Sequence, residues 1–197
     1  PNIPLKSDLK GYIEKLFSGP SDTALFYFSG HGCIDSTGSY IVTPDYELHD
    51  TGVSMDEILI LANESKAKDK VIILDCCYSG AFGSSRSLGG DKATIAEGVT
   101  ILAACMPDEP SMEYDGHGVF TRLLLDALQG GAADIEGRIT AGSIYAYIDQ
   151  ALGGWYQRPI FKTNVFRFNP LRTVTPKVSP EILRKLIEFF PSPEDHF

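Results

Sequence analysis

Two short segments of the sequence place reactive side chains beside small residues. In the first, His31 lies between Gly30 and Gly32, and in the second, Cys76 and Cys77 are adjacent. A cysteine becomes a nucleophile when a nearby imidazole accepts or shares its proton. The glycines let a substrate backbone approach the imidazole ring. We therefore predict that His31 and one of the two cysteines form a nucleophilic pair.

An apolar run that predicts a buried strand precedes each segment. Residues 24–28 are a short apolar and aromatic run bounded by turn signals. Residues 71–74 are a continuous run rich in β-branched side chains, which is typical of a central parallel strand covered on both faces. The carboxyl ends of parallel strands meet at one edge of a sheet. Two such ends can therefore bring a histidine and a cysteine together from distant sequence positions.

The rest of the chain alternates between helical and extended patterns. Ser54 and Glu57 have the spacing of a capping box at the start of one predicted helix. The predicted helices span residues 5–17, 54–63, 119–128 and 143–152, and the further strands span residues 40–42, 99–104 and 159–168. This alternation predicts an α/β fold in which a mainly parallel sheet carries helices on both faces.

Composition narrows the class of protein. The 197 residues carry 17 basic and 26 acidic side chains, a formal net charge of −9, so no basic surface is expected to bind nucleic acid. No apolar run approaches the roughly 20 residues that cross a membrane. The four cysteines are too few for a disulfide scaffold, and the chain opens on Pro1 without a signal sequence. We therefore expect a cytoplasmic protein.

Other interpretations of the same residues are structural or metal-binding. A lone histidine or a buried cysteine is often only a packing residue. Zinc could be bound by His31, Cys33, Cys105 and the adjacent cysteine pair, but the C-x-x-C spacing of structural zinc sites is absent. His117 is a rival base, although it follows a polar run rather than a strand.

The two motifs resemble those of the caspase-like cysteine peptidases. Residues 29–32 (SGHG) and 75–80 (DCCYSG) are similar to the metacaspase and bacterial orthocaspase branch of that family, and residues 118–121 (GVFT) open a helix as they do there. His31 and Cys77 are 46 positions apart, close to the spacing of about 50 in caspases. The resemblance covers about residues 5–170 and implies a three-layer sandwich and a cysteine endopeptidase.

The resemblance also assigns roles to single residues. The D-x-C pattern makes Cys77 the nucleophile and His31 its base, and the N–H groups of Gly32 and Cys77 form the oxyanion hole. Asp75 and Ser29 match positions that line the primary specificity pocket, where a carboxylate favours cleavage after Arg or Lys. The structural alternative for Asp75 is a strand-end carboxylate that caps a neighbouring turn.

The family pattern predicts how the chain is organised. Caspase-like domains begin with a strand and a helix ahead of the segment equivalent to residues 5–17, and this chain supplies neither. We expect residues 1–170 to form a peptidase domain that lacks its first strand, which an N-terminal fragment or upstream segment completes. Residues 171–197 are a Pro-rich extension with one helix, capped by Ser179 with Pro180 in its first turn.

Cofactors and partners follow from the same resemblance. No cofactor or metal is required, but Asp45, Asp56 and Glu57 resemble acidic positions that bind regulatory calcium in some metacaspases, with Ser84 where a further acid is expected. The expected partner is a protein substrate with a basic cleavage site, in stress, defence or cell-death signalling. The rival functions are a catalytically silent caspase-like adaptor and, on the same dyad, acyl transfer or peptide ligation.

Overall fold

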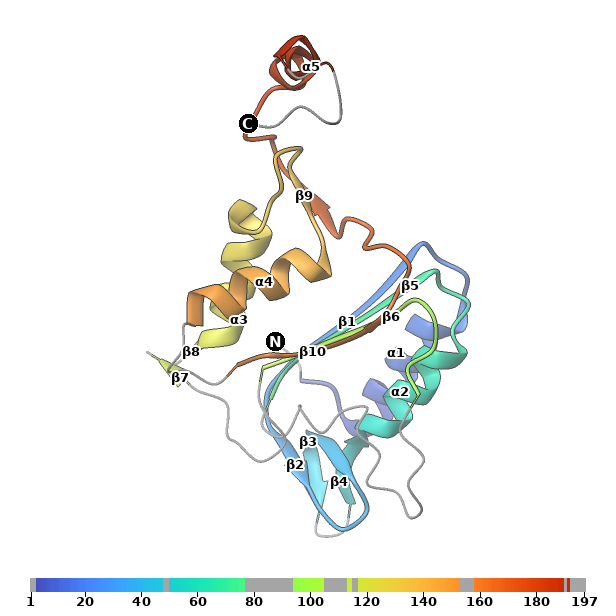
Figure 1. The fold of residues 1–197 in the computed structure, drawn as a ribbon. Helices are drawn as coiled ribbons and strands as arrows, with labels where there is room; N and C mark the ends of the chain where they lie inside the picture. Colours follow the sequence, from blue (N-terminus) through green and yellow to red (C-terminus); the bar gives the residue numbers. More distant parts are fainter. Residues whose placement is uncertain are drawn as a thin grey trace.

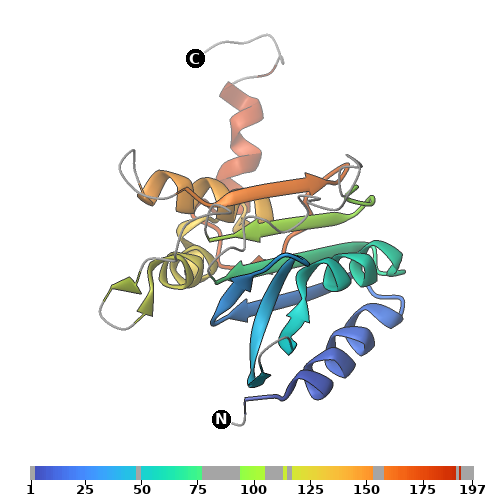
Figure 2. The same ribbon diagram turned by 90° about the horizontal axis from the view of Figure 1, so that it is seen from below.

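A computed structural model of the chain shows a four-stranded sheet at its centre. It describes residues 3–47, 50–76, 94–104, 113–114, 117–152, 158–189 and 191. The strands lie in the order β1 (Thr23–Ser29), β5 (Asp69–Asp75), β6 (Val99–Ala103) and β10 (Ile160–Asn164). β1, β5 and β6 are parallel and β10 is antiparallel to β6, so the sheet is mainly parallel, as predicted (Figure 2).

Two helices cover each face of this sheet, which gives three layers (Figure 1). One face packs against α1 (Lys6–Ser18) and α2 (Met55–Glu64), and the other against α3 (Val119–Asp126) and α4 (Ala141–Leu152). Alternate residues of β5 supply both cores: Ile72 and Leu74 face α1 and α2, whereas Val71 and Ile73 face α3 and α4. Burial on both faces explains the continuous apolar run in the sequence.

Several short elements were not predicted. An antiparallel sheet of β2 (Gly32–Ile34), β3 (Ser39–Glu47) and β4 (Asp50–Ser54) follows β1 directly. Of its three strands only β3 was predicted, as a shorter strand over residues 40–42. Gly52 lies in the middle of β4. A Cβ there would meet the Ile41 carbonyl oxygen of β3, so this strand pair needs a glycine. The remaining short elements are β7 (Glu113–Tyr114), β8 (His117–Gly118), the π-helical turn η2 (Ala127–Gly131), β9 (Arg138–Ile139) and β11 (Arg172–Thr173).

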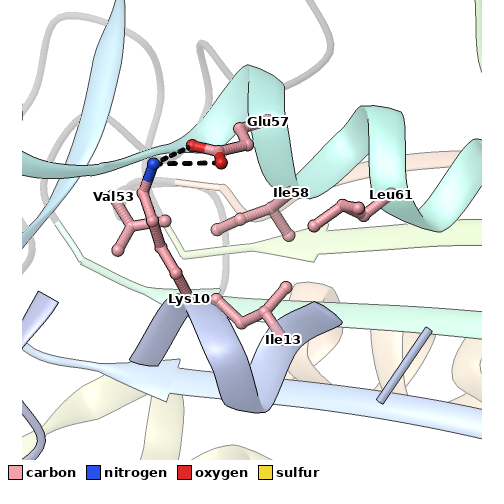
Figure 3. A pocket seen from close by; sticks show the side chains of 6 residues that line it. All are labelled: Lys10, Ile13, Val53, Glu57, Ile58 and Leu61. Carbon is pink, nitrogen blue, oxygen red and sulfur yellow. Dashed lines mark hydrogen bonds and ion pairs between the residues drawn. The ribbon is translucent and has the colours of Figure 1, made fainter. Parts of the chain in front are cut away.

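The predicted capping box at the start of α2 is only half right. The helix begins directly after Ser54, but the Ser54 hydroxyl makes no capping hydrogen bond. Glu57 instead pairs with Lys10 of α1, with 2.7 Å between the Lys10 Nζ and the Glu57 Oε2 (Figure 3). The shallow pocket below this ion pair has no room for a water molecule, and Ile13, Val53, Ile58 and Leu61 also line it. The pair therefore joins two helices across an apolar contact.

Within the described residues, β1 and β10 are the edge strands of the central sheet, and one helix stands apart from it. Among the described strands, β1 pairs only with β5, so its outer edge is open, and Leu25 and Tyr27 are 42% and 41% exposed. Helix α5 (Pro180–Phe189) stands away from the sheet and buries no residue (Figures 1 and 2). Its first turn is capped as predicted, since the Ser179 hydroxyl accepts the Ile182 N–H at 3.3 Å. No helix in the described ranges is long and apolar enough to cross a membrane.

Candidate active site

The carboxyl ends of β1 and β5 lie side by side. Ser29 is the register partner of Asp75, and the N–H of Gly30 donates a hydrogen bond to the Asp75 carbonyl oxygen at 3.1 Å. The two residues predicted to line a specificity pocket therefore share one end of the sheet. His31 follows this paired end by two residues, and Cys77 follows Asp75 by two.

His31 occupies a turn that is anchored on both sides. Its carbonyl oxygen accepts the Val42 N–H at 2.9 Å, which ties the turn to β3. Gly32 begins β2 and pairs in register with Ile41. The His31 side chain is exposed, so the imidazole has access to solvent and to a substrate. His31 thus lies two residues beyond the paired ends of β1 and β5.

The two adjacent cysteines are not equivalent. The Cys76 side chain is fully buried in the core formed with α1 and α2, as the alternation along β5 requires. Burial in an apolar core removes Cys76 from contact with a substrate. Cys77, the predicted nucleophile, lies outside the described residues. Asp75, one position before Cys76, belongs to the opposite face of the sheet, where β5 meets α3.

The Asp75 carboxylate is buried and strongly hydrogen-bonded. Its Oδ2 accepts hydrogen bonds from the Thr121 hydroxyl at 2.5 Å and from the Thr121 N–H at 3.2 Å. Asp75 is only 5% exposed. α3 has no capping side chain of its own at Gly118, so Asp75 supplies an acceptor for the third amide of that helix. The carboxylate therefore caps α3, as the structural alternative anticipated, and its role in specificity stays a prediction.

Two residues of this site were not singled out from the sequence. The Tyr27 hydroxyl lies 2.7 Å from the Thr121 Oγ1, so Tyr27, Thr121 and Asp75 form a continuous hydrogen-bonded chain. In the sequence, Thr121 is marked only as the last residue of the GVFT segment. The available signal was a helix that opens on a glycine with no acidic residue in its first turn, which needs an acceptor from elsewhere.

The residues considered for metal binding are engaged elsewhere or lie apart. Within the described ranges, no three His, Cys, Asp or Glu side chains gather closely enough to hold a metal ion. Asp45 accepts the Lys6 N–H at 3.1 Å. Glu57 is paired with Lys10. Ser84 and Cys105 lie outside the described residues, as does the side chain of His117.

Cys33 is the other cysteine that the structure describes. It lies in β2, two residues after His31, and it is half-buried. Burial is the main reason that the pKa of its thiol is raised, and the nearby Asp35 carboxylate raises it further. A raised pKa keeps the thiol protonated, so Cys33 is a poor candidate for a nucleophile.

Comparisons with known proteins agree on one fold. The architecture is similar to caspase-1 from Spodoptera frugiperda, with a TM-score of 0.59 and 16% identity over 83% of this chain and 70% of that one. It is also similar to protein GSU0716 from Geobacter sulfurreducens, with a TM-score of 0.61 and 16% identity over 87% and 79% of the two chains. At such low identity these likenesses show the fold alone. No curated protein sequence matches the chain.

The family itself is shown by sequence. A family model described as the caspase domain matches residues 2–167, which include both strand ends and the helix that Asp75 caps. The match spans most of the chain and both motifs on which the sequence prediction depended. The chain therefore belongs to the caspase-domain family of cysteine peptidases.

Proposed function

We propose that the chain is a cysteine endopeptidase of the metacaspase type that cleaves proteins after Arg or Lys. Cys77 is the nucleophile and His31 its base. The observation that carries the proposal is the pairing of the two strand ends, with Ser29 opposite Asp75 and the Gly30 N–H bonded to the Asp75 carbonyl. The motif residues that follow these ends are each two positions beyond the last register pair.

The proposed reaction is an acyl transfer in two steps. The Cys77 sulfur attacks the carbonyl carbon of the scissile bond, and the N–H groups of Gly32 and Cys77 stabilise the negative oxygen that forms. His31 takes the thiol proton and gives it to the leaving amine. A water molecule then gives one proton to His31 and attacks the thioester carbon. The C–S bond breaks, the acid is released, and His31 gives that proton to the Cys77 sulfur.

The proposed specificity depends on the negative charge of Asp75. Odd-numbered residues of β5 face α3 and α4, so Asp75 is on the face to which the Tyr27 hydroxyl also reaches. A carboxylate hydrogen-bonded to a guanidinium or ammonium group forms a charge-assisted contact. An Arg or Lys side chain before the scissile bond would complement it, with Ser29 as a neighbouring polar contact.

The open edge of β1 supports the proposal that another segment completes the sheet. An exposed strand edge presents unpaired N–H and C=O groups, and a further strand can satisfy them. A hollow of about 340 Å³ lies beside this edge, lined by residues 26–29 of β1, residues 42–44 of β3, and Ile3, Pro4 and Leu9. We propose that a segment upstream of this chain fills it, and that the protein acts in the cytoplasm in regulated stress, defence or cell-death signalling.

Hydrolysis of peptide reporters tests this function. We expect the purified protein to cleave reporters that end in Arg or Lys and not those that end in Asp. Cys77→Ala should lower kcat by a factor on the order of 10⁴ or more, because it removes the nucleophile. Cys76→Ala is the matched control and should retain activity, since that side chain is buried in the opposite core.

Three results would contradict the proposal in different ways. Activity that survives Cys77→Ala but not Cys76→Ala would overturn the choice of nucleophile. Cleavage after Asp would overturn the role of Asp75. No turnover of any reporter, with and without added Ca²⁺, would favour the adaptor. Mass spectrometry of the products separates hydrolysis from peptide ligation.

A further inference from the structure

The hydrogen-bonded chain of Tyr27, Thr121 and Asp75 joins the three elements that surround the proposed specificity site. Tyr27 is on β1, four residues before His31; Asp75 is on β5, two residues before Cys77; Thr121 is in the first turn of α3. Thr121 and Asp75 are separated by 46 positions, so the contact is tertiary. The three hydrogen-bonded residues thus belong to three different elements.

The two side-chain hydrogen bonds run in one direction, from Tyr27 through Thr121 to Asp75. An ionised carboxylate only accepts hydrogen bonds, so the Thr121 hydroxyl must donate its single hydrogen to the Asp75 Oδ2. The same hydroxyl oxygen can then only accept, so the Tyr27 O–H donates to it across 2.7 Å. Tyr27 therefore orients Thr121, and Thr121 orients the carboxylate.

Both bonds from Thr121 go to the same carboxylate oxygen. The Thr121 N–H and hydroxyl hold Oδ2, which fixes the rotation of the carboxylate plane. Gly118 lies close to the same oxygen, because a Cβ at that position would be 2.5 Å from Oδ2. With Oδ2 held in this way, Oδ1 is the oxygen whose direction the network sets for a further partner.

We propose that Thr121 and Tyr27 are positioning residues for substrate specificity: they hold the Asp75 carboxylate so that one oxygen meets the basic side chain of the substrate. This inference rests on the proposed cleavage after Arg or Lys. Preorganised charge binds better than charge that must be oriented during binding. The effect belongs to recognition of the basic side chain, so it appears in KM and not in the chemical step.

Steady-state kinetics on an Arg reporter and on its neutral citrulline analogue test the inference. Thr121→Val removes the hydroxyl at nearly constant volume, and we expect it to raise KM for the Arg reporter about tenfold with kcat within about twofold. KM for the citrulline reporter should change little. Thr121→Ser, which keeps the hydroxyl, should restore KM to within about twofold of the wild type.

Tyr27→Phe and Thr163→Val extend the test. Tyr27 is partly exposed, so Tyr27→Phe should leave the fold intact, and we expect it to raise KM for Arg by about threefold. Thr163→Val is the matched control: it deletes a hydroxyl that lies 2.8 Å from the Thr100 Oγ1 on β6 and β10, and it should leave KM unchanged.

The outcomes separate this inference from the function on which it rests. If the wild type cleaves after Arg but Thr121→Val and Tyr27→Phe leave KM for Arg unchanged, the positioning role is overturned and the proposed function stands. Equal losses with the Arg and citrulline reporters would also overturn it, because a merely structural role affects both. If the wild type cleaves no reporter, the proposed function fails and the inference falls with it.

Discussion

The two ends of strand β5 each bury a charged side chain, and they stabilise it in different ways. At the amino end, Lys70 is 5% exposed and its Nζ donates to the Glu97 carbonyl oxygen at 2.7 Å. At the carboxyl end, Asp75 is equally buried and accepts two bonds from Thr121 of α3. Lys70 is satisfied by the main chain just before the neighbouring strand, whereas Asp75 is oriented by side chains from two other elements.

Lys70 and Asp75 also differ in the role that each charge can have. Burial lowers the pKa of Lys70, which shows that its charged form is disfavoured there, although the Asp69 and Glu97 carboxylates oppose this effect. Lys70 is remote from both motifs along the sheet. Asp75 lies at the strand end that pairs with the end of β1, two residues before His31. We infer that one charge serves the fold and that the other serves the fold and recognition together.

Asp75→Asn should give the largest effect of the comparison. Asparagine caps a helix about as well as aspartate, so the unfolding midpoint should change little. The lost negative charge should lower kcat/KM for the Arg reporter by about 30- to 150-fold, the equivalent of about 2–3 kcal/mol for a hydrogen bond to a charged group. Paired kinetic and thermal unfolding measurements check both. Full activity toward Arg would mean that the two ends of β5 do not differ as we infer.

The Asp75 site also shows what the sequence could and could not predict. The strand before it was predictable because burial on both faces demands an apolar run, and the buried side of Cys76 followed from alternation. The hydrogen-bond partner of Asp75 was not predictable, because the bond to Thr121 spans 46 positions and depends on how α3 packs on the sheet. The capping box failed for the same reason: Lys10 of another helix takes Glu57.

Lys70→Met should affect stability and leave activity unchanged. The folded-state pKa of Lys70 is lower than its unfolded value of about 10.5, so the unfolded chain binds more protons between the two values. The unfolding free energy of the wild type should therefore rise relative to Lys70→Met as the pH approaches 10.5 from below. Urea unfolding at pH 7 and pH 10 measures this. A loss of kcat/KM in Lys70→Met would contradict the inference that Lys70 serves the fold alone.

The smallest effect is expected on the α1–α2 face, away from both ends. Lys10→Gln removes the ion pair with Glu57, whose side chains are 35% and 38% exposed. Such a pair contributes about 1 kcal/mol or less, and salt screens it. The coupling energy between Lys10 and Glu57 is measured from the urea midpoints of Lys10→Gln, Glu57→Gln and the double variant. The measurement is made at low and at high salt. A change in reporter cleavage would show that this face takes part in the function.

The reactivity of the cysteines shows whether the paired strand ends assemble a Cys77–His31 dyad, as we propose. Alkylation by iodoacetamide across a pH series, followed by peptide mass spectrometry, reports each thiol separately. Cys33, whose pKa is raised mainly by burial, is the internal reference. We predict that Cys77 reacts with a midpoint below about pH 7.5 and that His31→Gln moves this midpoint toward about 8.5. The same midpoint in both proteins would contradict it.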